Sequence, residues 1–343
     1  NGYLYFWAPN GVNPNTLLVE ASVHDYGVKM GNWSWPINNV SVSNIKFTRQ
    51  GSAGVKTEGG CSYISVMGCE FTELYHGIDS YTADHNNYDH NTFRDTYASA
   101  VHCFDNNTTI DHNKLNNIAL VGGEGESFFG YFGILVSGTG NTVRGNRLDN
   151  IGYSGIFSDG NTLVEKNFVS HFLYTLNDGG GVYWDNGVGV TVQDNIVVDP
   201  IGNMESIAMD HQTNVTVRVG IYFGNAIITN ATVRRNTAAN CDLGLWVDHT
   251  MVSHGHQIRD NVMFNNKDAQ MGFSDFSNYN GPGAAYPFAL PGYDDIYTNN
   301  TCYAMSNTQM CILAVNRWYN GVDFGTFANN KYHNPWNGNS FMI

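Results

Sequence analysis

The sequence predicts an all-β chain folded as a single-stranded right-handed parallel β-helix, a solenoid of about ten or more coils. Two strand-like patterns that recur out of phase with each other predict this fold, and helix signals are nearly absent. The first pattern is a β-branched or apolar residue, two variable residues, Asn, one residue and then an apolar residue. It occurs at Ile110-Asn113-Leu115, Val143-Asn146-Leu148, Val164-Asn167-Val169, Val192-Asn195-Val197, Val233-Asn236-Ala238 and Ile258-Asn261-Met263, and Asn91 with Phe93 fits it as well.

The spacing of this pattern matches the coils of a solenoid. From Asn91 onward, successive occurrences lie 21 to 41 residues apart; a short step spans one coil, and a long step contains an inserted loop. A single coil cannot bury its own apolar face, so coils must stack about 4.8 Å apart. An Asn at the same turn of every coil can then form an inward ladder of amide hydrogen bonds. In two earlier coils Ile45 and Cys69 take the place of Asn, and Cys69 is expected to be a buried thiol.

The whole chain, residues 1–343, is expected to form one β-helix domain, because no linker or shift in composition divides it. Residues 1–38 are expected to form strands that lead into the helix, and residues 39–343 to form coils with inserted loops. The last coil is predicted at Phe327-Asn330-Tyr332, after which no cap is obvious. Since terminal repeats need caps, the chain is expected to be a fragment of a longer protein.

The charge of the chain excludes several classes of partner. There are 16 Lys and Arg against 30 Asp and Glu, which gives a net charge of −14. Such a surface repels nucleic acid and anionic membranes, so a neutral glycan, or an anionic one bridged by a metal, is the expected partner.

No apolar run is long enough to span a membrane. The low Lys content and several N-x-[ST] sites fit a secreted or cell-surface protein, which is expected to be a monomer.

Cysteine and histidine spacing gives no sign of a metal centre. Six cysteines are too few to form the framework of a chain of this length, although Cys302 and Cys311 could form a local disulfide. No pair has CxxC spacing, and His254 and His256 lack an evident third ligand, so no metal site is expected. Asp-His dipeptides recur, but adjacent residues of a strand face opposite ways, so they are not expected to act as dyads. These dipeptides lie at 84–85, 89–90, 111–112, 210–211 and 248–249.

The second strand pattern ends in aspartates. Asp159, Asp185, Asp210 and Asp248 are predicted to occupy the same place in successive coils, and residues 271–275 can extend the series. Stacked in register, their Cα atoms would lie roughly 5 Å apart, and repulsion between like charges would raise some of their pKa values. A functional site or a bound cation would explain such a row. The structural alternative is that these aspartates cap turns at the ends of strands.

A run of three glycines follows Asp178, in the segment LNDGGGVY that ends at Tyr183. Glycines at this point would let a ligand approach the backbone closely, whereas the structural alternative is an ordinary Asp-Gly turn. The run is not a phosphate-binding loop, because no helix follows it.

The segment HFLYTLNDGGGVYW, followed by SIAMDHQTNVTV, resembles the β-helix glycoside hydrolases of the pectate-lyase-like superfold, which include xylan- and fucoside-cleaving enzymes. Those sequences often carry an NDGGAIY segment and a GIYLDD..SNVTV segment, with a catalytic carboxylate in each. The resemblance covers most of residues 1–340 loosely, and residues 172–217 more sharply. It implies that Asp178 and Asp210 are the catalytic pair.

The chain departs from that pattern at three positions. Ala208 stands in place of an aromatic residue, His211 in place of a second Asp, and Asp185 is an additional acid and a third catalytic candidate. The implied mechanism is glycoside hydrolysis, in which one carboxylic acid protonates the leaving oxygen and the other carboxylate attacks the anomeric carbon or activates water. Asp210 is the expected acid, because its apolar strand neighbours suggest a drier setting.

Sugar binding needs aromatic platforms and hydrogen-bonding groups. In a strand Tyr183 would share a face with Asp185, and Trp246 with Asp248, so both rings are predicted platforms. Trp184 would face the other way, into the core. The further predicted substrate contacts are Asp159, Asp248, His102 and His211. The inserted loops at 121–131 and 278–294 are expected to form cleft walls, in which Glu124 and Glu126 are solvated.

Two other functions remain open at this point. Many polysaccharide lyases share the fold, and a lyase needs a base and a cation to neutralise a uronate; Lys and Arg are few, but a Ca²⁺ ion held by the aspartates could supply the charge. A non-catalytic adhesin or phage spike is the third reading, because a β-helix alone implies no activity. No cofactor is expected apart from this possible Ca²⁺.

Overall fold

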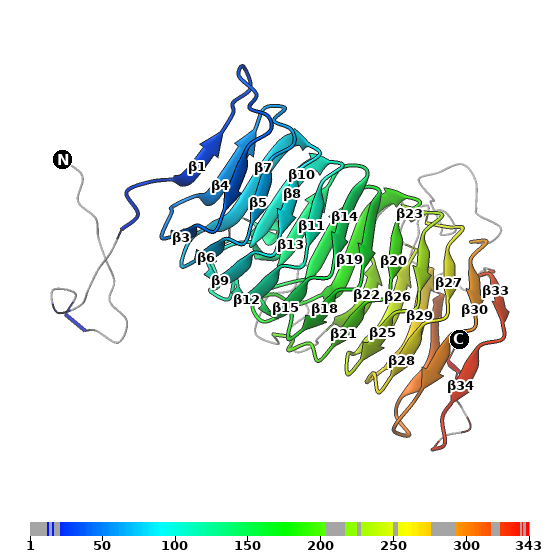
Figure 1. Ribbon diagram of the computed structural model, residues 1–343. Helices are drawn as coiled ribbons and strands as arrows, with labels where there is room; N and C mark the ends of the chain where they lie inside the picture. The colour runs from blue at the N-terminus through cyan, green and yellow to red at the C-terminus, as the bar shows by residue number, and fades with distance from the viewer. Residues whose placement is uncertain are drawn as a thin grey trace, which may run out of the picture.

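Three parallel β-sheets wind around one elongated core in the computed structural model, as a right-handed parallel β-helix (Figure 1). The coils stack in chain order along the axis, from blue to red in the figure. The fold class predicted from the sequence is therefore confirmed. The structure describes residues 12–13, 16, 21–125, 127–203, 217–224, 228–249, 253–275, 293–316, 323–336, 338 and 341–342, with the side chains of 128, 129, 316, 341 and 342 excepted.

Each coil adds one strand to each sheet, in the order A, B, C. Sheet A contains β1 (Tyr26–Met30), β4 (Ala53–Glu58), β7 (His76–Asp84), β10 (Val101–Asn106), β13 (Ile134–Ser137), β16 (Ile156–Asp159), β19 (Gly179–Val188), β22 (Arg218–Phe223), β26 (Leu243–Asp248), β29 (Ala269–Asp275), β32 (Met310–Asn316) and β35 (Phe341–Met342), and β23 (Ile228–Thr229) pairs with β19 off this path. Sheet B contains β2 (Ser41–Ser43), β5 (Ser65–Met67), β8 (Asn87–Asp89), β11 (Thr109–Asp111), β14 (Asn141–Arg144), β17 (Thr162–Glu165), β20 (Thr191–Gln193), β24 (Thr232–Arg234), β27 (Gln257–Arg259), β30 (Ile296–Thr298) and β33 (Thr326–Ala328). Sheet C contains β3 (Lys46–Thr48), β6 (Glu70–Thr72), β9 (Thr92–Thr96), β12 (Lys114–Ile118), β15 (Arg147–Ile151), β18 (Phe168–Ser170), β21 (Ile196–Val198), β25 (Thr237–Ala239), β28 (Val262–Phe264), β31 (Thr301–Tyr303) and β34 (Lys331–His333), and the short 3₁₀ helix η3 (Phe128–Tyr131) lies in an inserted loop.

The core is made of side chains that repeat at the same place in each coil. In sheet C the rings of Phe47, Phe71 and Phe93 stack at centroid distances of 5.1 and 4.8 Å. Sheet B contributes a parallel row that begins with Val42 and Val66 and continues through Tyr88. Because each coil buries its apolar face only against the next, this stacking holds the solenoid together.

The predicted asparagine ladder is present and longer than the sequence pattern showed. Each Asn side-chain amide donates to the Oδ1 of the next Asn at 3.0–3.1 Å, and each Oδ1 also accepts from a backbone N–H of the preceding coil. Asn300 and Asn330 complete the series beyond Asn261. The ladder consists of Asn91, Asn113, Asn146, Asn167, Asn195, Asn236, Asn261, Asn300 and Asn330. Cys69 lies one coil before the ladder, and its side chain is a buried thiol, as predicted. The backbone N–H of Cys69 donates to Asn91 Oδ1.

Two expectations about pairs of side chains were wrong. All six cysteines are thiols, and the Sγ of Cys311 lies against the carbonyl oxygen of Cys302 at 3.6 Å rather than in a disulfide. The Asp-His dipeptides at 84–85, 89–90 and 111–112 do make contact, because each His has a positive φ of 48° to 54° at a turn and is not part of a regular strand. A left-handed residue breaks the alternation of faces on which the expectation rested.

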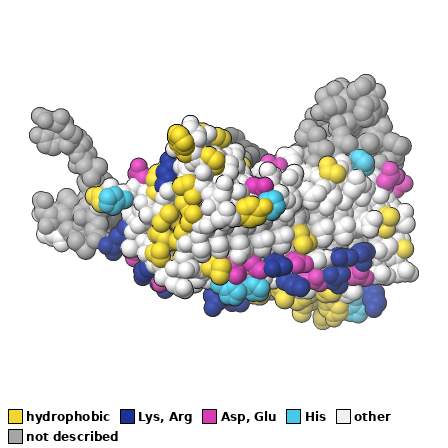
Figure 2. All heavy atoms as spheres, turned by 45° about the horizontal axis from the view of Figure 1, so that its top comes forward, with side chains coloured by type: hydrophobic (Ala, Val, Ile, Leu, Met, Phe, Trp, Pro, Cys, Tyr) yellow, Lys and Arg dark blue, Asp and Glu magenta, His cyan; other side chains and the backbone are white. Residues whose placement is uncertain are grey.

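Figure 2 shows charged side chains gathered in a narrow band along one edge of the molecule, whereas most of the face in view carries neither sign. Several of the charges are paired between coils, as with Arg144 and Asp111 at 2.8 Å and Arg235 and Asp194 at 2.7 Å. No helix among the described residues is long and apolar enough to cross a membrane.

Candidate active site on the outward face of sheet A

The outward face of sheet A carries one side chain from the middle of each strand, in a single row along the solenoid. Strand register places these residues side by side from coil to coil, and their chemistry changes from charged to aromatic along the row. Both parts of this face are candidates for chemistry. The row runs Lys29, Lys56, Asp79, His102, Leu135, Phe157, Tyr183, Tyr222, Trp246, Gly272 and Leu313.

The first part is a lysine–histidine cluster, formed by Lys56, His76, Asp79 and His102. The Lys56 ammonium donates to Asp79 Oδ2 at 2.6 Å, and His102 Nδ1 lies 3.0 Å from Asp79 Oδ1. The His76 ring stacks on the His102 ring at 4.9 Å and contacts the Ser99 carbonyl oxygen through Nδ1 at 2.9 Å. All four residues are largely buried, and the exposed fraction of the side chain is 14% for His102 and 11% for both Lys56 and Asp79.

The pKa values in this cluster show that its charges are compensated. Burial alone would raise the pKa of Asp79, but the hydrogen bonds from His102 and Lys56 and the charge of Lys56 outweigh burial and lower the pKa to about 2. Burial lowers the pKa of His76 to about 4, and the neighbouring His102 contributes to the same shift. At neutral pH the cluster therefore holds an ionised Asp79 between cationic or neutral donors.

The second part is an acid–tyrosine cluster, formed by Tyr153, Asp178, Tyr183, Asp185, Tyr222 and Asp248. Asp185 occupies a β-bulge, since Ser158 pairs with Trp184 whereas Asp159 pairs with Asn186. Its Oδ1 is buried and has no hydrogen-bond partner among the described residues. Burial raises the pKa of Asp185 despite a hydrogen bond from Tyr183, and the like charge of Asp159 raises it further.

Asp248 is the most strongly perturbed acid of the acid–tyrosine cluster. Only 5% of the residue is exposed, and burial raises its pKa to about 6. The Ser274 hydroxyl donates to Asp248 Oδ1 at 2.6 Å, which offsets part of the shift. A carboxyl group with this pKa is partly protonated near neutral pH, which suits a proton donor.

Tyr222 lies within range of the charges of three carboxyl groups. Burial raises the pKa of its phenol, and the charges of Asp178, Asp248 and Asp185 raise it further. Tyr153 is affected by Asp178 and Asp185 in the same way, and its hydroxyl donates to the Asp178 carbonyl oxygen at 2.6 Å. Asp178 itself has a φ of +60°, at the bend that starts β19.

The aromatic rings of this face pack mainly on one another. Tyr183 stacks on Tyr222 at 4.9 Å, and Trp246 lies over Gly272, where a Cβ would meet the ring at 2.4 Å. Tyr183 and Trp246 face outward as predicted, but only 6% and 7% of them are exposed, so a sugar could reach only their edges. Trp184 points into the core, which confirms the sequence interpretation.

The three glycines after Asp178 have a different use from the one expected. A Cβ on Gly179 would lie 2.8 Å from the Tyr153 ring, one on Gly180 would lie 2.9 Å from Tyr222, and one on Gly181 would lie 2.2 Å from Val197. The space beside these glycines is therefore taken by the protein's own side chains. The glycines let the tyrosines of the cluster pack against the start of β19. They leave no room for a ligand to approach the backbone there.

The predicted row of aspartates is present only in part. Asp159 and Asp185 are neighbours, but the strand next to β19 is β22, and Gly224 follows it where an acid was expected. The place beside β19 that was predicted for residues 205–210 is taken by β22 instead; residues 204–216, which include Asp210 and His211, lie outside the described residues. Asp248 is thus two coils from Asp185. Asp275 does not extend the row, because strand register places Ser274 beside Asp248; Asp275 is buried and accepts from the Tyr293 hydroxyl at 2.5 Å.

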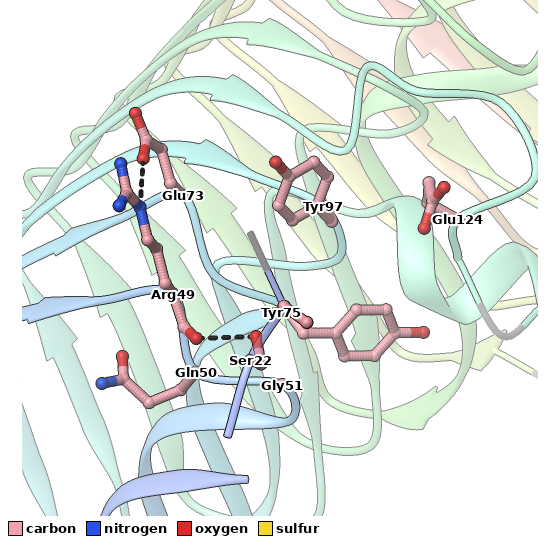
Figure 3. A pocket seen from close by; sticks show the side chains of 9 residues that line it. Ser22, Arg49, Gln50, Gly51, Glu73, Tyr75, Tyr97 and Glu124 are labelled. Atoms are coloured by element: carbon pink, nitrogen blue, oxygen red, sulfur yellow. Dashed lines mark hydrogen bonds and ion pairs between the residues drawn. The ribbon is translucent and has the colours of Figure 1, made fainter. Parts of the chain in front are cut away.

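A cavity of about 450 Å³ opens beside the lysine–histidine cluster (Figure 3). In this view the rings of Tyr75 and Tyr97 lie between Arg49 and Glu124. Tyr75 also packs edge-on against His76 at 4.8 Å, which connects the cavity with the cluster. Glu124, which is exposed, comes from the inserted loop at 121–131, so this loop lines the cavity beside the lysine–histidine cluster; its predicted place as a wall of the cleft along the aspartates stays a prediction. Most of the second predicted wall, at 278–294, lies outside the described residues.

Comparisons with known proteins agree with the fold. The family described as right handed beta helix region matches residues 15–126. No curated protein sequence matches the chain. Among solved structures, the surface protein and adhesin PfbA of Streptococcus pneumoniae is 11% identical over 91% of this chain and 84% of its own, with a TM-score of 0.51.

Two further structures are more distant. A mutant of the periplasmic alginate epimerase AlgG is 12% identical over 78% of this chain, with a TM-score of 0.43, and this chain spans only 62% of its length. The Agl-KA catalytic domain is 13% identical over 88% of this chain and 61% of its own, with a TM-score of 0.46. The likeness to PfbA, at 11% identity, shows a shared architecture and no more, and the chain is in this sense a right-handed parallel β-helix protein.

Proposed function

We propose that this chain is a glycoside hydrolase that cleaves a plant or microbial polysaccharide or oligosaccharide on the outward face of sheet A. The observation that carries the proposal is that the charges of Asp178, Asp185 and Asp248 all act on the Tyr222 phenol, while burial raises the pKa values of Asp185 and Asp248. Two-carboxylate hydrolysis requires one carboxyl group to be protonated and another ionised in the same place.

Within this proposal Asp248 is the general acid, because burial keeps its pKa at about 6. Asp178 is the nucleophile or base, since it lies in the same cluster and matches the glycosidase motif. Asp185 adds a further negative charge near Asp178, and the edges of the Tyr183 and Trp246 rings contact the sugar. Asp210, which the resemblance makes the acid, is the competing assignment.

The test is release of reducing ends from a panel of neutral glycans by the full chain and its variants. Asp178→Asn and Asp248→Asn should each lower the rate by roughly 100-fold or more, because each removes a proton-transfer or nucleophilic group. Asp210→Asn decides between the two candidate acids. Asp194→Asn is the matched control, because Asp194 is a partly exposed carboxylate paired with Arg235 at a turn. Full activity in both the Asp178 and Asp248 variants would place the site elsewhere.

A polysaccharide lyase is the second candidate, and the lysine–histidine cluster is the observation that favours it. A lyase needs a basic residue to take the α-proton of a uronate, and His102 is the accessible base on this face. The Lys56 charge is already paired with Asp79, so a Ca²⁺ ion would have to neutralise the uronate. Absorbance of unsaturated uronates, lost in His102→Gln and retained in Asp248→Asn, would favour the lyase.

A binding role without turnover is the remaining alternative. It predicts retention of a glycan with no change in reducing ends or in absorbance. Composition supports work outside the cell, and we propose a secreted monomer that needs no cofactor.

A further inference from the structure

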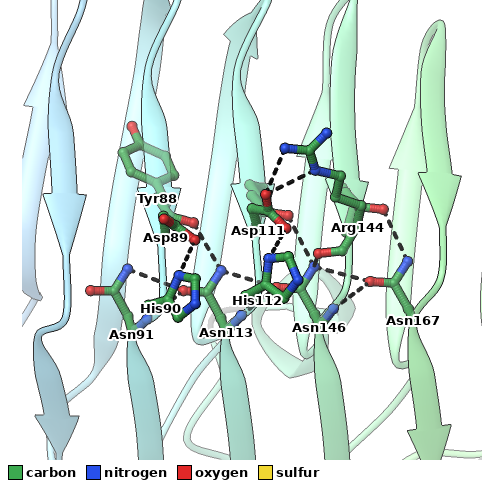
Figure 4. Close-up of polar contacts among 12 residues, drawn as sticks. Tyr88, Asp89, His90, Asn91, Asp111, His112, Asn113, Arg144, Asn146 and Asn167 are labelled. Carbon is green, nitrogen blue, oxygen red and sulfur yellow. Dashed lines mark hydrogen bonds and ion pairs between the residues drawn. The ribbon is translucent and has the colours of Figure 1, made fainter.

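Two Asp-His dipeptides lie side by side on consecutive coils, on the turn between sheets B and C (Figure 4). Asp89 ends β8 and Asp111 ends β11, and the two residues are partners in the strand register. His90 and His112 follow them with φ values of 53° and 48°. This turn is separate from the outward face of sheet A and takes no part in the proposed hydrolysis.

The side chains of the two dipeptides form one compact group. The His90 and His112 rings stack at a centroid distance of 5.1 Å, tilted by 19°. His90 Nδ1 lies 2.6 Å from Asp89 Oδ1, and His112 Nδ1 lies 2.5 Å from Asp111 Oδ1. One ligand atom each from Asp89, His90 and His112 falls within 4.8 Å of the others.

We propose that Asp89, His90 and His112 bind a divalent transition-metal ion such as Zn²⁺ or Ni²⁺. Two imidazole nitrogens and one carboxylate oxygen are a typical ligand set for these ions, with water completing the coordination. Bonds of about 2.0–2.2 Å require the ligand atoms to move closer together than they are. The imidazoles can do so by side-chain rotation, because 67% and 56% of the His90 and His112 side chains are exposed. Imidazole ligands disfavour Ca²⁺, which takes oxygen.

The backbone that carries the ligands is already fixed. Asn91 and Asn113 directly follow the two histidines, and both are members of the buried ladder, joined at 3.1 Å. The two histidines are therefore held one coil apart before any ion arrives, and binding need only order exposed side chains. Such preorganisation lowers the entropy cost of binding.

Asp111 acts as a positioning residue in this site. Its Oδ2 accepts from Arg144 Nε and Nη2, each at 2.8 Å, while its Oδ1 lies 2.5 Å from His112 Nδ1 in a contact that lacks hydrogen-bond geometry. A rotation of the exposed His112 ring would make this contact a hydrogen bond. A carboxylate held in this way orients an imidazole and leaves Nε2 to the metal, and loss of such an outer partner typically weakens binding by about 10- to 100-fold.

Isothermal titration of the full chain with ZnCl₂, and separately with NiCl₂, after treatment with EDTA tests the proposal. Wild type should bind one ion, and His90→Asn or His112→Asn should weaken binding at least about 10-fold, since each removes a ligand. Asn is the conservative choice, because Asn44 and Asn299 adopt a positive φ at the equivalent turn of other coils. Asp111→Asn should reduce affinity without changing the stoichiometry.

His171→Asn is the matched control. His171 has the same positive φ and the same contact with a carboxylate, at 2.7 Å from Asp149, but its neighbours in the adjoining coils are Asn150 and Asp199. The His171→Asn variant should bind metal with the affinity of wild type. No binding by wild type, or wild-type affinity in a His90→Asn, His112→Asn double variant of unchanged circular dichroism, would overturn the proposal.

Discussion

The lysine–histidine cluster and the acid–tyrosine cluster lie on the same outward face of sheet A, yet they shift the pKa of a carboxyl group in opposite directions. Asp79 lies between Lys56 and His102, and its pKa falls to about 2. Against its burial Asp248 has the hydrogen bond from the Ser274 hydroxyl and the smaller effect of the His249 charge, and its pKa rises to about 6. Both residues are buried to a similar degree, so the difference comes from their partners and not from their depth.

The contrast separates an acid that stabilises the fold from an acid that is available for chemistry. A paired carboxylate contributes to folding and has little tendency to take up a proton. An unpaired one costs stability, and natural proteins retain such groups mainly where they are used. The acid–tyrosine cluster is therefore the better candidate for proton transfer, although the lysine–histidine cluster looks more like a catalytic arrangement at first sight.

Removal of Asp79 should produce the largest change in stability. Asp79→Asn leaves the Lys56 and His102 side chains largely buried without their anion, which should lower the free energy of unfolding by about 3–5 kcal/mol. The stabilisation by Asp79 is present above its unfolded-state pKa near 3.8 and is lost as the pH falls toward 2. Urea unfolding followed by circular dichroism between pH 2 and 7 measures both effects.

Glu58→Gln is the control for this loss. Glu58 pairs with Lys29 at 2.8 Å on the neighbouring coils, but 42% of the Lys29 side chain is exposed, so the change should cost no more than about 1 kcal/mol. Equal losses in the two variants would mean that burial of the lysine–histidine cluster does not strengthen its ion pair.

Asp248→Asn should raise the free energy of unfolding, whereas Asp79→Asn should lower it. The folded-state pKa of about 6 lies above the ordinary value of 3.8, so the folded protein binds the proton more tightly, and stability falls as the pH rises from about 4 through 6. A neutral amide avoids this cost, and the variant should be about 1–3 kcal/mol more stable than wild type at pH 7. Its stability should also vary less between pH 4 and 7 in the same urea experiment. A variant less stable than wild type at pH 7 would remove the contrast between the clusters.

The sequence predicted the regular parts of this molecule well, because regular parts repeat. The ladder asparagines, the inward Val and Phe rows and the outward position of Tyr183 all follow from strand alternation and a constant turn. Asn300 was missed although Tyr297 and Cys302 stand at the apolar places of its coil, as Phe327 and Tyr332 do in the predicted last coil.

The errors fall where the chain departs from the repeat. The insertion between β21 and β22 contains a strand-like segment that alternates like its neighbours, and nothing local distinguishes it from the strand that actually pairs with β19. The bulge at Asp185 changes the register by one residue, which a pattern of alternate positions cannot anticipate. The pairing of Lys56 with Asp79 was overlooked for a different reason. The two residues meet only because successive coils stack, and both occupy the place that His102 takes in the next strand of the sheet.

The smallest expected effect tests the partner of Asp248 directly. Ser274→Ala removes the hydrogen bond to Asp248 Oδ1, which is the larger of the two effects that oppose burial, so the pKa of Asp248 should rise above about 6, by roughly one unit or less. Carboxyl carbon NMR of the full chain, with Asp248→Asn to assign the resonance, measures this pKa. Ser158→Ala is the control, because that buried hydroxyl of sheet A has no hydrogen-bond partner among the described residues. An Asp248 pKa that stays the same or falls in Ser274→Ala would show that the hydroxyl does not stabilise the carboxylate, and that the difference between the two clusters does not arise from their hydrogen-bond partners.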